Sequence, residues 1–165
     1  MLIVSVKEIK NFLISIIIPL GVGFLSSTIS KLLLKMDISE FYSQLIKPSF
    51  APPANIFPIV WTIIFVLMGV SYYLISKNDK KDPKVNDAIF YYYLQLGLNF
   101  LWSILFFGLD LRFTSIFNIL ILIVVLIMIF KFYKIDKRAA FLNIPYLLWL
   151  IFALFLNYFI WIINK

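Results

Sequence analysis

The sequence predicts an all-α integral membrane protein: a bundle of five transmembrane helices with a short extramembrane helix in the first loop. Its 165 residues are 63% hydrophobic and 14% charged, with a mean hydropathy of +1.00, which leaves too few charges to cover a water-soluble domain. The charges are also segregated, because five charge-free gaps of about 18 residues or more can each cross a bilayer as a helix. These gaps lie between Lys10 and Lys31, Lys47 and Lys77, Asp87 and Asp110, Arg112 and Lys131, and Arg138 and Lys165.

We assign the five spans to one domain over residues 1–165. They are expected at about 9–33, 58–76, 88–108, 113–133 and 139–163. Pro19 predicts a bend or break in the first span, and Gly21 and Gly23 predict close approach by a neighbouring helix. Pro58 and Pro145 fall in the first turns of their spans, where proline is tolerated. The first span is longer than a signal-peptide core and no A-x-A-like cleavage site follows it, so we expect it to be retained.

The lid loop, residues 37–57, joins the first two spans, and its first part is too polar to cross a membrane. Ser39 is the expected cap of a short helix, and Pro48 is its expected end. One side of that helix should carry Phe41, Tyr42, Leu45 and Ile46. Pro52 and Pro53 should stiffen the chain that follows, so that little entropy is lost when the loop covers a ligand.

The basic residues predict the orientation of the bundle. Ten of the fifteen lie at the N-terminus or in the two loops on the same side as it. Positive residues favour the cytoplasm, so the N-terminus is predicted to be cytoplasmic, with the lid loop outside. We expect the membrane to be that of a bacterial cell. The net charge of +7 does not indicate nucleic-acid binding, because it lies in short loops. The segment KNDKKDPK, residues 77–84, is interpreted as a solvated turn.

Several functional classes lack their usual residues. The chain has no cysteine and no histidine, which excludes disulfides, thiolate chemistry and the commonest zinc and haem ligands. We therefore expect no metal site. The charge-free interiors of the spans offer no carboxylate, lysine or arginine for a proton relay, and the chain offers no combination of residues for conventional acid–base or nucleophilic catalysis.

The informative residues inside the spans are amides and aromatic rings. Gln95, Asn99 and Trp102 share one face of the third span by their spacing. Comparable faces of the second and fifth spans carry Trp61, Phe65, Met68 and Tyr72, and Trp149, Ala153, Leu156 and Ile160, with Asn157 at the edge. One interpretation is helix packing and interfacial belts. The other is a flat, apolar pocket for a planar ligand.

Five segments, in order along nearly the whole chain, resemble the translocator protein family (TspO/MBR), which includes bacterial tryptophan-rich sensory proteins and the mitochondrial peripheral-type benzodiazepine receptor. FYSQLIKPSFAPP (41–53) is similar to the family's W-Y-x-x-L-x-K-P-S-W-x-P-P loop. FPIVWTIIFVLMGVSYYL (57–74) is similar to its second-span signature P-x-x-W-x-x-x-Y-x-x-M-G-x-x-x-Y-L. The other three are PLGVGFLSS (19–27), QLGLNFLWSILFFG (95–108) and PYLLWLIFALFLNYFIW (145–161).

The resemblance implies a five-helix bundle, commonly a homodimer in contact with membrane lipid, that binds tetrapyrroles such as protoporphyrin IX and benzodiazepine-site ligands such as isoquinoline carboxamides. No cofactor is required; the tetrapyrrole is a ligand. The family's ligand contacts correspond to Tyr42, Pro52, Trp61, Asn99, Trp102, Trp149 and Ala153. The leading hypothesis is therefore a receptor, sensor or carrier for tetrapyrroles.

Two alternatives remain open. The resemblance links tryptophans that correspond to Trp61 and Trp149 to weak, light- and oxygen-dependent degradation of protoporphyrin. The other alternative is a non-catalytic scaffold whose pocket holds a lipid or an isoprenoid.

The sequence also departs from the family pattern. Phe41 and Phe50 replace two tryptophans, which removes two indole N–H donors. Asn118 stands where the fourth span often has a carboxylate. Tyr158 is one residue too far from Lys165 for the cholesterol-recognition pattern, so sterol binding is not predicted.

Overall fold

The computed structural model describes residues 5–79, 81–110 and 114–164, and these contain helices and no strand. The expectations that concern Lys80, Arg112, Phe113 and Lys165 lie outside these residues. The helices are α1 (Val6–Leu34), α2 (Ile38–Gln44), α3 (Ile56–Ser76), α4 (Pro83–Ser103), the π-helix η1 (Ile104–Gly108), α5 (Ser115–Ile135), α6 (Lys137–Phe141) and α7 (Ile144–Ile163).

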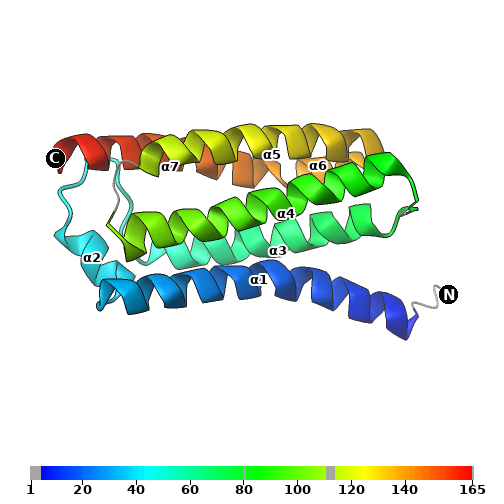
Figure 1. The fold of residues 1–165 in the computed structure, drawn as a ribbon, viewed down its shortest axis with the longest axis horizontal. Helices are drawn as coiled ribbons and strands as arrows, with labels where there is room; N and C mark the ends of the chain where they lie inside the picture. Colours follow the sequence, from blue (N-terminus) through cyan, green and yellow to red (C-terminus); the bar gives the residue numbers. More distant parts are fainter. Residues whose placement is uncertain (1–4, 80, 111–113, 165) are drawn as a thin grey trace.

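The helices form an elongated bundle that confirms the predicted fold class (Figure 1). Within the described residues, five helical segments are long and apolar enough to cross a membrane. Helix α1 packs against α3 and η1, and α5 packs against both α4 and α7. The two ends of the chain lie at opposite ends of the bundle, and α2 lies at the same end as the C-terminus (Figure 1).

The outer surface of the bundle is apolar. Ile17 is 62% exposed, Phe24 72% and Phe130 59%, and these three residues come from the outer faces of α1 and α5. Such a surface along the length of a bundle would be unstable in water but is expected in contact with lipid tails. The protein is therefore an integral membrane protein.

Helix α1 runs through Pro19 without a break, so that part of the prediction is wrong, although the helix curves along its length (Figure 1). Proline leaves the carbonyl of residue 15 without its usual helical donor. The backbone of Gly69 in α3 packs against that carbonyl: a Cβ at Gly69 would lie 2.6 Å from the Ser15 oxygen. Gly23 adjoins the ring of Phe65 as predicted, whereas nothing lies within 4 Å of a Cβ at Gly21.

The third span begins and ends differently from the prediction. Asp82 accepts a hydrogen bond from the backbone N–H of Lys84 at 2.9 Å and caps α4, so the helix starts at Pro83 and the charged turn is shorter than expected. The span ends in η1, where the chain widens into a π-helix. A Cβ at Gly108 would lie 3.3 Å from the Cα of Ser30. This close contact brings the end of the third span against α1.

The fifth span consists of two helices, α6 and α7. Pro145 lies in the first turn of α7 as predicted, but it cannot donate to the preceding turn, and the helix is interrupted at Leu142 and Asn143. The amide of Asn143 donates to the carbonyl of Ala139 at 2.8 Å and to the hydroxyl of Ser71 at 2.6 Å. The first bond gives the Ala139 carbonyl a donor where the helix is interrupted, and the second attaches this segment to α3.

The lid loop contains α2 but differs in detail. Asp37, not Ser39, is the N-cap, and it forms an ion pair with Lys31 at the end of α1. The helix ends at Gln44, before Pro48. Phe41, Tyr42 and Leu45 are buried, whereas Ile46, which was expected on the same side of the helix, is 63% exposed. Its backbone N–H donates to Asn164 Oδ1 at 2.9 Å, and Asn164 Nδ2 donates to its carbonyl at 2.8 Å, so the loop is anchored to the end of α7.

Candidate functional site

A cavity of about 660 Å³ lies inside the bundle at the end covered by α2. Helices α1, α3, α4, α5 and α7 all contribute to its walls. Six of the seven residues predicted to bind a ligand line it: Tyr42, Trp61, Asn99, Trp102, Trp149 and Ala153. The cavity thus brings together side chains from four segments that are far apart in the sequence.

Pro52, the seventh predicted residue, does not line this cavity. Its carbonyl accepts a hydrogen bond from the Tyr42 hydroxyl at 3.0 Å. Tyr42 is 4% exposed and packs edge-on against Phe57 with ring centroids 5.0 Å apart. Burial raises the pKa of the Tyr42 hydroxyl, so it remains a neutral donor. Pro52 therefore holds Tyr42 in place in the cavity wall.

Lys47 secures the end of α2. Its ammonium group donates to the carbonyls of Tyr42, Ser43 and Leu45 at 2.8–3.1 Å and lies 5.0 Å from the centre of the Tyr42 ring. The last carbonyls of a helix have no partner within the helix, and a cation at that end also complements the helix dipole. Lys47 thus stabilises the part of the lid loop that covers the cavity.

Aromatic rings form most of the cavity wall. Trp61 stacks on Phe65 at 5.3 Å, and Trp102 stacks on Phe106 at 5.2 Å. The ring centroids of Trp149 and Phe57 lie 5.8 Å apart, in an edge-on arrangement. Apart from the Lys31–Asp37 pair, which is more than half exposed, the lining contains no charged residue among those described. Such a wall favours flat, apolar ligands, which bind by contact area more than by charge.

A buried hydrogen-bond chain fixes the polar part of the wall. Asn99 Nδ2 donates to the Tyr146 hydroxyl at 2.9 Å, and that hydroxyl donates to Gln95 Oε1 at 3.0 Å. Tyr146 is 1% exposed, and its ring lies 6.2 Å from Trp61. Tyr146 was not among the residues predicted from the sequence, although its position one helical turn before Trp149 could have indicated it.

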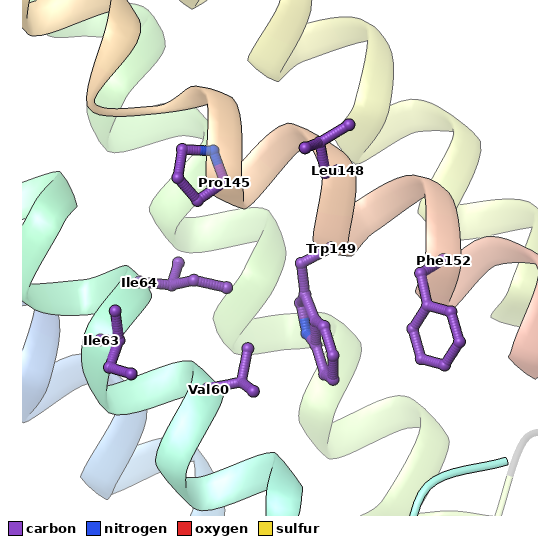
Figure 2. A pocket seen from close by; sticks show the side chains of 7 residues that line it. All are labelled: Val60, Ile63, Ile64, Pro145, Leu148, Trp149 and Phe152. Carbon is purple, nitrogen blue, oxygen red and sulfur yellow. The ribbon is translucent and has the colours of Figure 1, made fainter.

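A second, smaller cavity of about 370 Å³ lies between α3 and α7. Seven residues, all apolar, line it: Val60, Ile63, Ile64, Pro145, Leu148, Trp149 and Phe152 (Figure 2). Ile63 is 55% exposed and Leu148 62% exposed, so the cleft reaches the outer surface of the bundle. Trp149 also lines the main cavity and therefore stands between it and the lipid-facing cleft.

The structure limits the chemistry of the site. In the part of the chain described, no three acidic residues lie together where they could hold a metal ion. Among the described residues that line the main cavity, Lys31 and Asp37 are the one acid–base pair, and both are more than half exposed. Trp61 and Trp149 both line the cavity, and their role in light-dependent oxidation stays a prediction.

Comparison with known proteins identifies the family. The TspO/MBR family model matches residues 15–162. The chain is 35% identical over 153 residues to the tryptophan-rich protein TspO of Chlorobaculum tepidum, covering 92% of this chain and 94% of that relative. It is 34% identical to the protein of the same name from Archaeoglobus fulgidus, and the match covers 95% of this chain and 99% of that relative. It is 32% identical to the human translocator protein, and the match covers 74% of this chain and 73% of that relative. The chain belongs to the TspO/MBR family of integral membrane proteins.

Proposed function

We propose that this protein binds a tetrapyrrole such as protoporphyrin IX in the main cavity and acts as a membrane receptor, sensor or carrier for it. The observation that carries the proposal is the cavity of about 660 Å³ with Trp61, Trp102 and Trp149 in its wall. Its volume falls within the range of small-molecule sites, roughly 300–1,000 Å³. Planar benzodiazepine-site ligands, such as isoquinoline carboxamides, suit the same aromatic wall.

The names of two relatives agree with this functional class. A relative from Cereibacter sphaeroides, 32% identical over 127 residues, is named tryptophan-rich sensory protein, and the human relative is named translocator protein. A sensor and a carrier both require a site that holds the ligand inside the membrane. Neither requires a charged relay when the ligand partitions into the bilayer.

The cleft between α3 and α7 supports a lateral route for the ligand. Its lining is entirely apolar and reaches the lipid-facing surface. Trp149 is shared by the cleft and the main cavity, so a rotation of this side chain would connect them. An apolar ligand dissolved in the bilayer could then reach the site without crossing the lid loop.

Quenching of tryptophan fluorescence by protoporphyrin IX tests the proposal. Micromolar protoporphyrin IX should quench the purified protein saturably, because Trp61, Trp102 and Trp149 would lie beside the ring. The Trp61→Phe/Trp149→Phe variant should show weaker quenching and a higher dissociation constant. Trp161→Phe is the matched control, since Trp161 does not line the cavity. Wild-type quenching no greater than that of the double variant would contradict the site.

A lipid or isoprenoid scaffold is the alternative that this cavity also accommodates. Native mass spectrometry of the protein released from its membrane distinguishes the two. A tetrapyrrole mass, or a stoichiometric shift on adding protoporphyrin IX, supports the proposal. A retained lipid or isoprenoid that protoporphyrin IX does not displace contradicts it.

We also propose the orientation with the N-terminus in the cytoplasm of a bacterial cell and a homodimeric assembly. The orientation is supported by the excess of basic residues near the end of the bundle where the N-terminus lies. Five spans then place the C-terminus outside the cytoplasm, so a reporter fused there that works only outside the cytoplasm should be active. A cytoplasmic signal from the same fusion would contradict the orientation.

A further inference from the structure

The lining of the main cavity becomes more polar along α1. Leu20, Val22 and Phe24 line its apolar part, whereas Ser26, Ser27 and Lys31 line its polar part, in the last third of the helix. Given the rise of an α-helix, about 16 Å separate Leu20 from Lys31 along the helix axis. A ligand that occupies this length meets apolar side chains at one end and polar side chains at the other.

The polar end of the cavity opens at the surface of the bundle, because exposed residues line it. Lys31 lies near the end of α1, and Asp37 and Ser39 lie at the start of α2. All three are exposed, and these two helix ends lie next to each other in Figure 1. We call Lys31, Asp37 and Ser39 the mouth of the cavity. A polar group of a ligand can stay in contact with water at the mouth while its apolar part is buried.

Lys31 is the one cation that lines the cavity among the described residues, and its ion pair is exposed. The ammonium group lies 2.5 Å from Asp37 Oδ1, and the two side chains are 56% and 59% exposed. An exposed ion pair contributes little to stability, because water solvates both charges when the pair is broken. A second carboxylate at the mouth can therefore replace that of Asp37 at small cost.

We propose that Lys31 binds a carboxylate of the ligand at the mouth, and that Asp37 competes with this carboxylate for the ammonium group. The proposal rests on the proposed function, in which the aromatic wall holds the ring. The stacked rings at Trp61 and Trp102 offer contact area to any flat ligand, so Lys31 supplies the discrimination. The preferred ligands are planar, apolar rings that carry a carboxylate at one edge, as protoporphyrin IX does.

The ion pair also joins the end of α1 to α2, which carries Tyr42 of the cavity wall. A purely structural pair and a competing pair predict opposite effects of Asp37→Asn, which keeps a good N-cap for α2. If the pair only holds α2 in place, this variant binds every ligand more weakly. If Asp37 competes for Lys31, the variant binds a carboxylate ligand more tightly and an uncharged one as before.

Protoporphyrin IX and its dimethyl ester test the role of Lys31, because they share one ring system and differ in charge. Dissociation constants are measured by tryptophan quenching at about pH 7, where the free acid is ionised. The nanodiscs contain phosphatidylcholine, which has no net charge. The affinity of the acid divided by that of the ester is compared between variants, because differences in bilayer partitioning are then the same for each and cancel.

Lys31→Met removes the charge and keeps a long side chain, so it should lower this ratio by about threefold or more. Asp37→Asn should raise the ratio by about twofold or more, and Lys31→Arg, which keeps the charge, should retain the preference for the acid. Lys35→Met is the matched control and should leave the ratio unchanged, because Lys35 is exposed at the same end of α1 and does not line the cavity.

Three results would overturn the role of Lys31. One is a ratio in Lys31→Met equal to that of wild-type protein or of Lys35→Met. Another is equally weakened binding of acid and ester in both Lys31→Met and Asp37→Asn, which would make the pair structural. The third is a failure of both porphyrins to bind wild-type protein saturably, which contradicts the proposed function as well. Saturable binding with an unchanged ratio contradicts the role of Lys31 alone.

Discussion

Tyr42 connects the lid loop to the cavity through a single hydroxyl group. Its ring contributes to the cavity wall, and its hydroxyl donates to the Pro52 carbonyl ten residues later. The hydrogen bond closes a compact segment that already contains Pro48, Pro52 and Pro53, whose backbones have little freedom to lose. At the scale of single residues, a closed lid loop therefore depends on this hydroxyl.

Tyr42→Phe should destabilise the closed lid loop by about 1 kcal/mol, the typical contribution of one hydrogen bond. We expect faster dissociation of protoporphyrin IX, measured by stopped-flow recovery of tryptophan fluorescence, with a smaller change in association rate. Tyr158→Phe removes a hydroxyl from a lipid-facing residue that is 46% exposed and serves as the control. Equal dissociation rates for Tyr42→Phe and wild-type protein would show that the hydroxyl does not hold the loop.

At the scale of elements, the contact between α1 and α3 depends on backbone packing. Pro19 leaves the carbonyl of Ser15 without a helical donor, and Gly69 brings the backbone of α3 against it. Small residues permit this approach between membrane helices. Ser15 is 3% exposed, so the contact also protects this carbonyl from lipid.

Gly69→Ala should lower the free energy of unfolding by about 1–3 kcal/mol, because the new methyl group overlaps backbone atoms that cannot move aside. Gly97→Ala, on an exposed part of α4 with nothing within 4 Å of its Cβ, should raise stability by about 0.5–1 kcal/mol. Thermal unfolding in detergent measures both. Similar midpoints for the two variants would contradict the close packing of α1 and α3.

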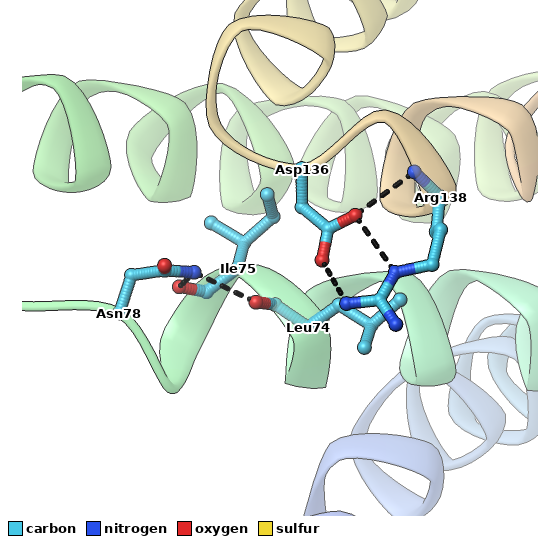
Figure 3. Close-up of polar contacts among 5 residues, drawn as sticks. All are labelled: Leu74, Ile75, Asn78, Asp136 and Arg138. Carbon is cyan, nitrogen blue, oxygen red and sulfur yellow. Dashed lines mark hydrogen bonds and ion pairs between the residues drawn. The ribbon is translucent and has the colours of Figure 1, made fainter.

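The link between α5 and α6 depends on Asp136. Its carboxylate accepts hydrogen bonds from the backbone N–H of Arg138 at 2.9 Å and from the guanidinium Nη2 and Nε of Arg138 at 2.9 and 3.2 Å. Figure 3 shows these contacts beside the end of α3. There the side-chain amide of Asn78 donates to the carbonyls of Leu74 and Ile75 (Figure 3). The hydrogen bond from Arg138 lowers the pKa of Asp136. A carboxylate with a lowered pKa stabilises the fold above its unfolded-state pKa, and this contribution is lost as the pH falls through the folded pKa.

Asp136→Ala should cost about 0.5–2 kcal/mol at pH 7 through loss of the helix cap. The difference from wild-type protein should begin to shrink below about pH 4, the unfolded-state pKa of an aspartate, and shrink further as the pH falls through the lower pKa of folded Asp136. Asp136→Asn keeps a capping oxygen but has no charge, so it should destabilise less and show a flatter pH dependence. Thermal midpoints of wild-type protein and of both variants, measured from pH 3 to 7, test these expectations. A difference that stays constant over that range would exclude the carboxylate as its cause.

At the scale of the whole molecule, hydrophobic length and charge spacing were enough to predict the five spans. The helical spacing of Asn99 with Trp102, and of Trp149 with Ala153, correctly grouped residues that line one cavity. These features depend on the period of the α-helix and on the thickness of the bilayer, both of which can be read from one chain.

Details that depend on contacts between helices could not be predicted in this way. Pro19 was expected to bend or break α1, and the helix continues through it, with Gly69 of another span packed against the carbonyl that Pro19 leaves without a donor. The interruption at Asn143 relies on Ser71, which is 72 residues away. Pro52 was expected at the ligand and instead accepts a bond from Tyr42.

The affinity of Ala153→Phe for protoporphyrin IX tests most directly whether the ligand occupies the main cavity. Ala153 lines that cavity, and a phenylalanine there would fill the space that the ring is proposed to occupy. Ile151→Phe, on the outer face of the same helix, is the matched control. The account predicts that Ala153→Phe weakens binding by at least about tenfold while Ile151→Phe binds like wild-type protein. Wild-type affinity in Ala153→Phe would contradict it.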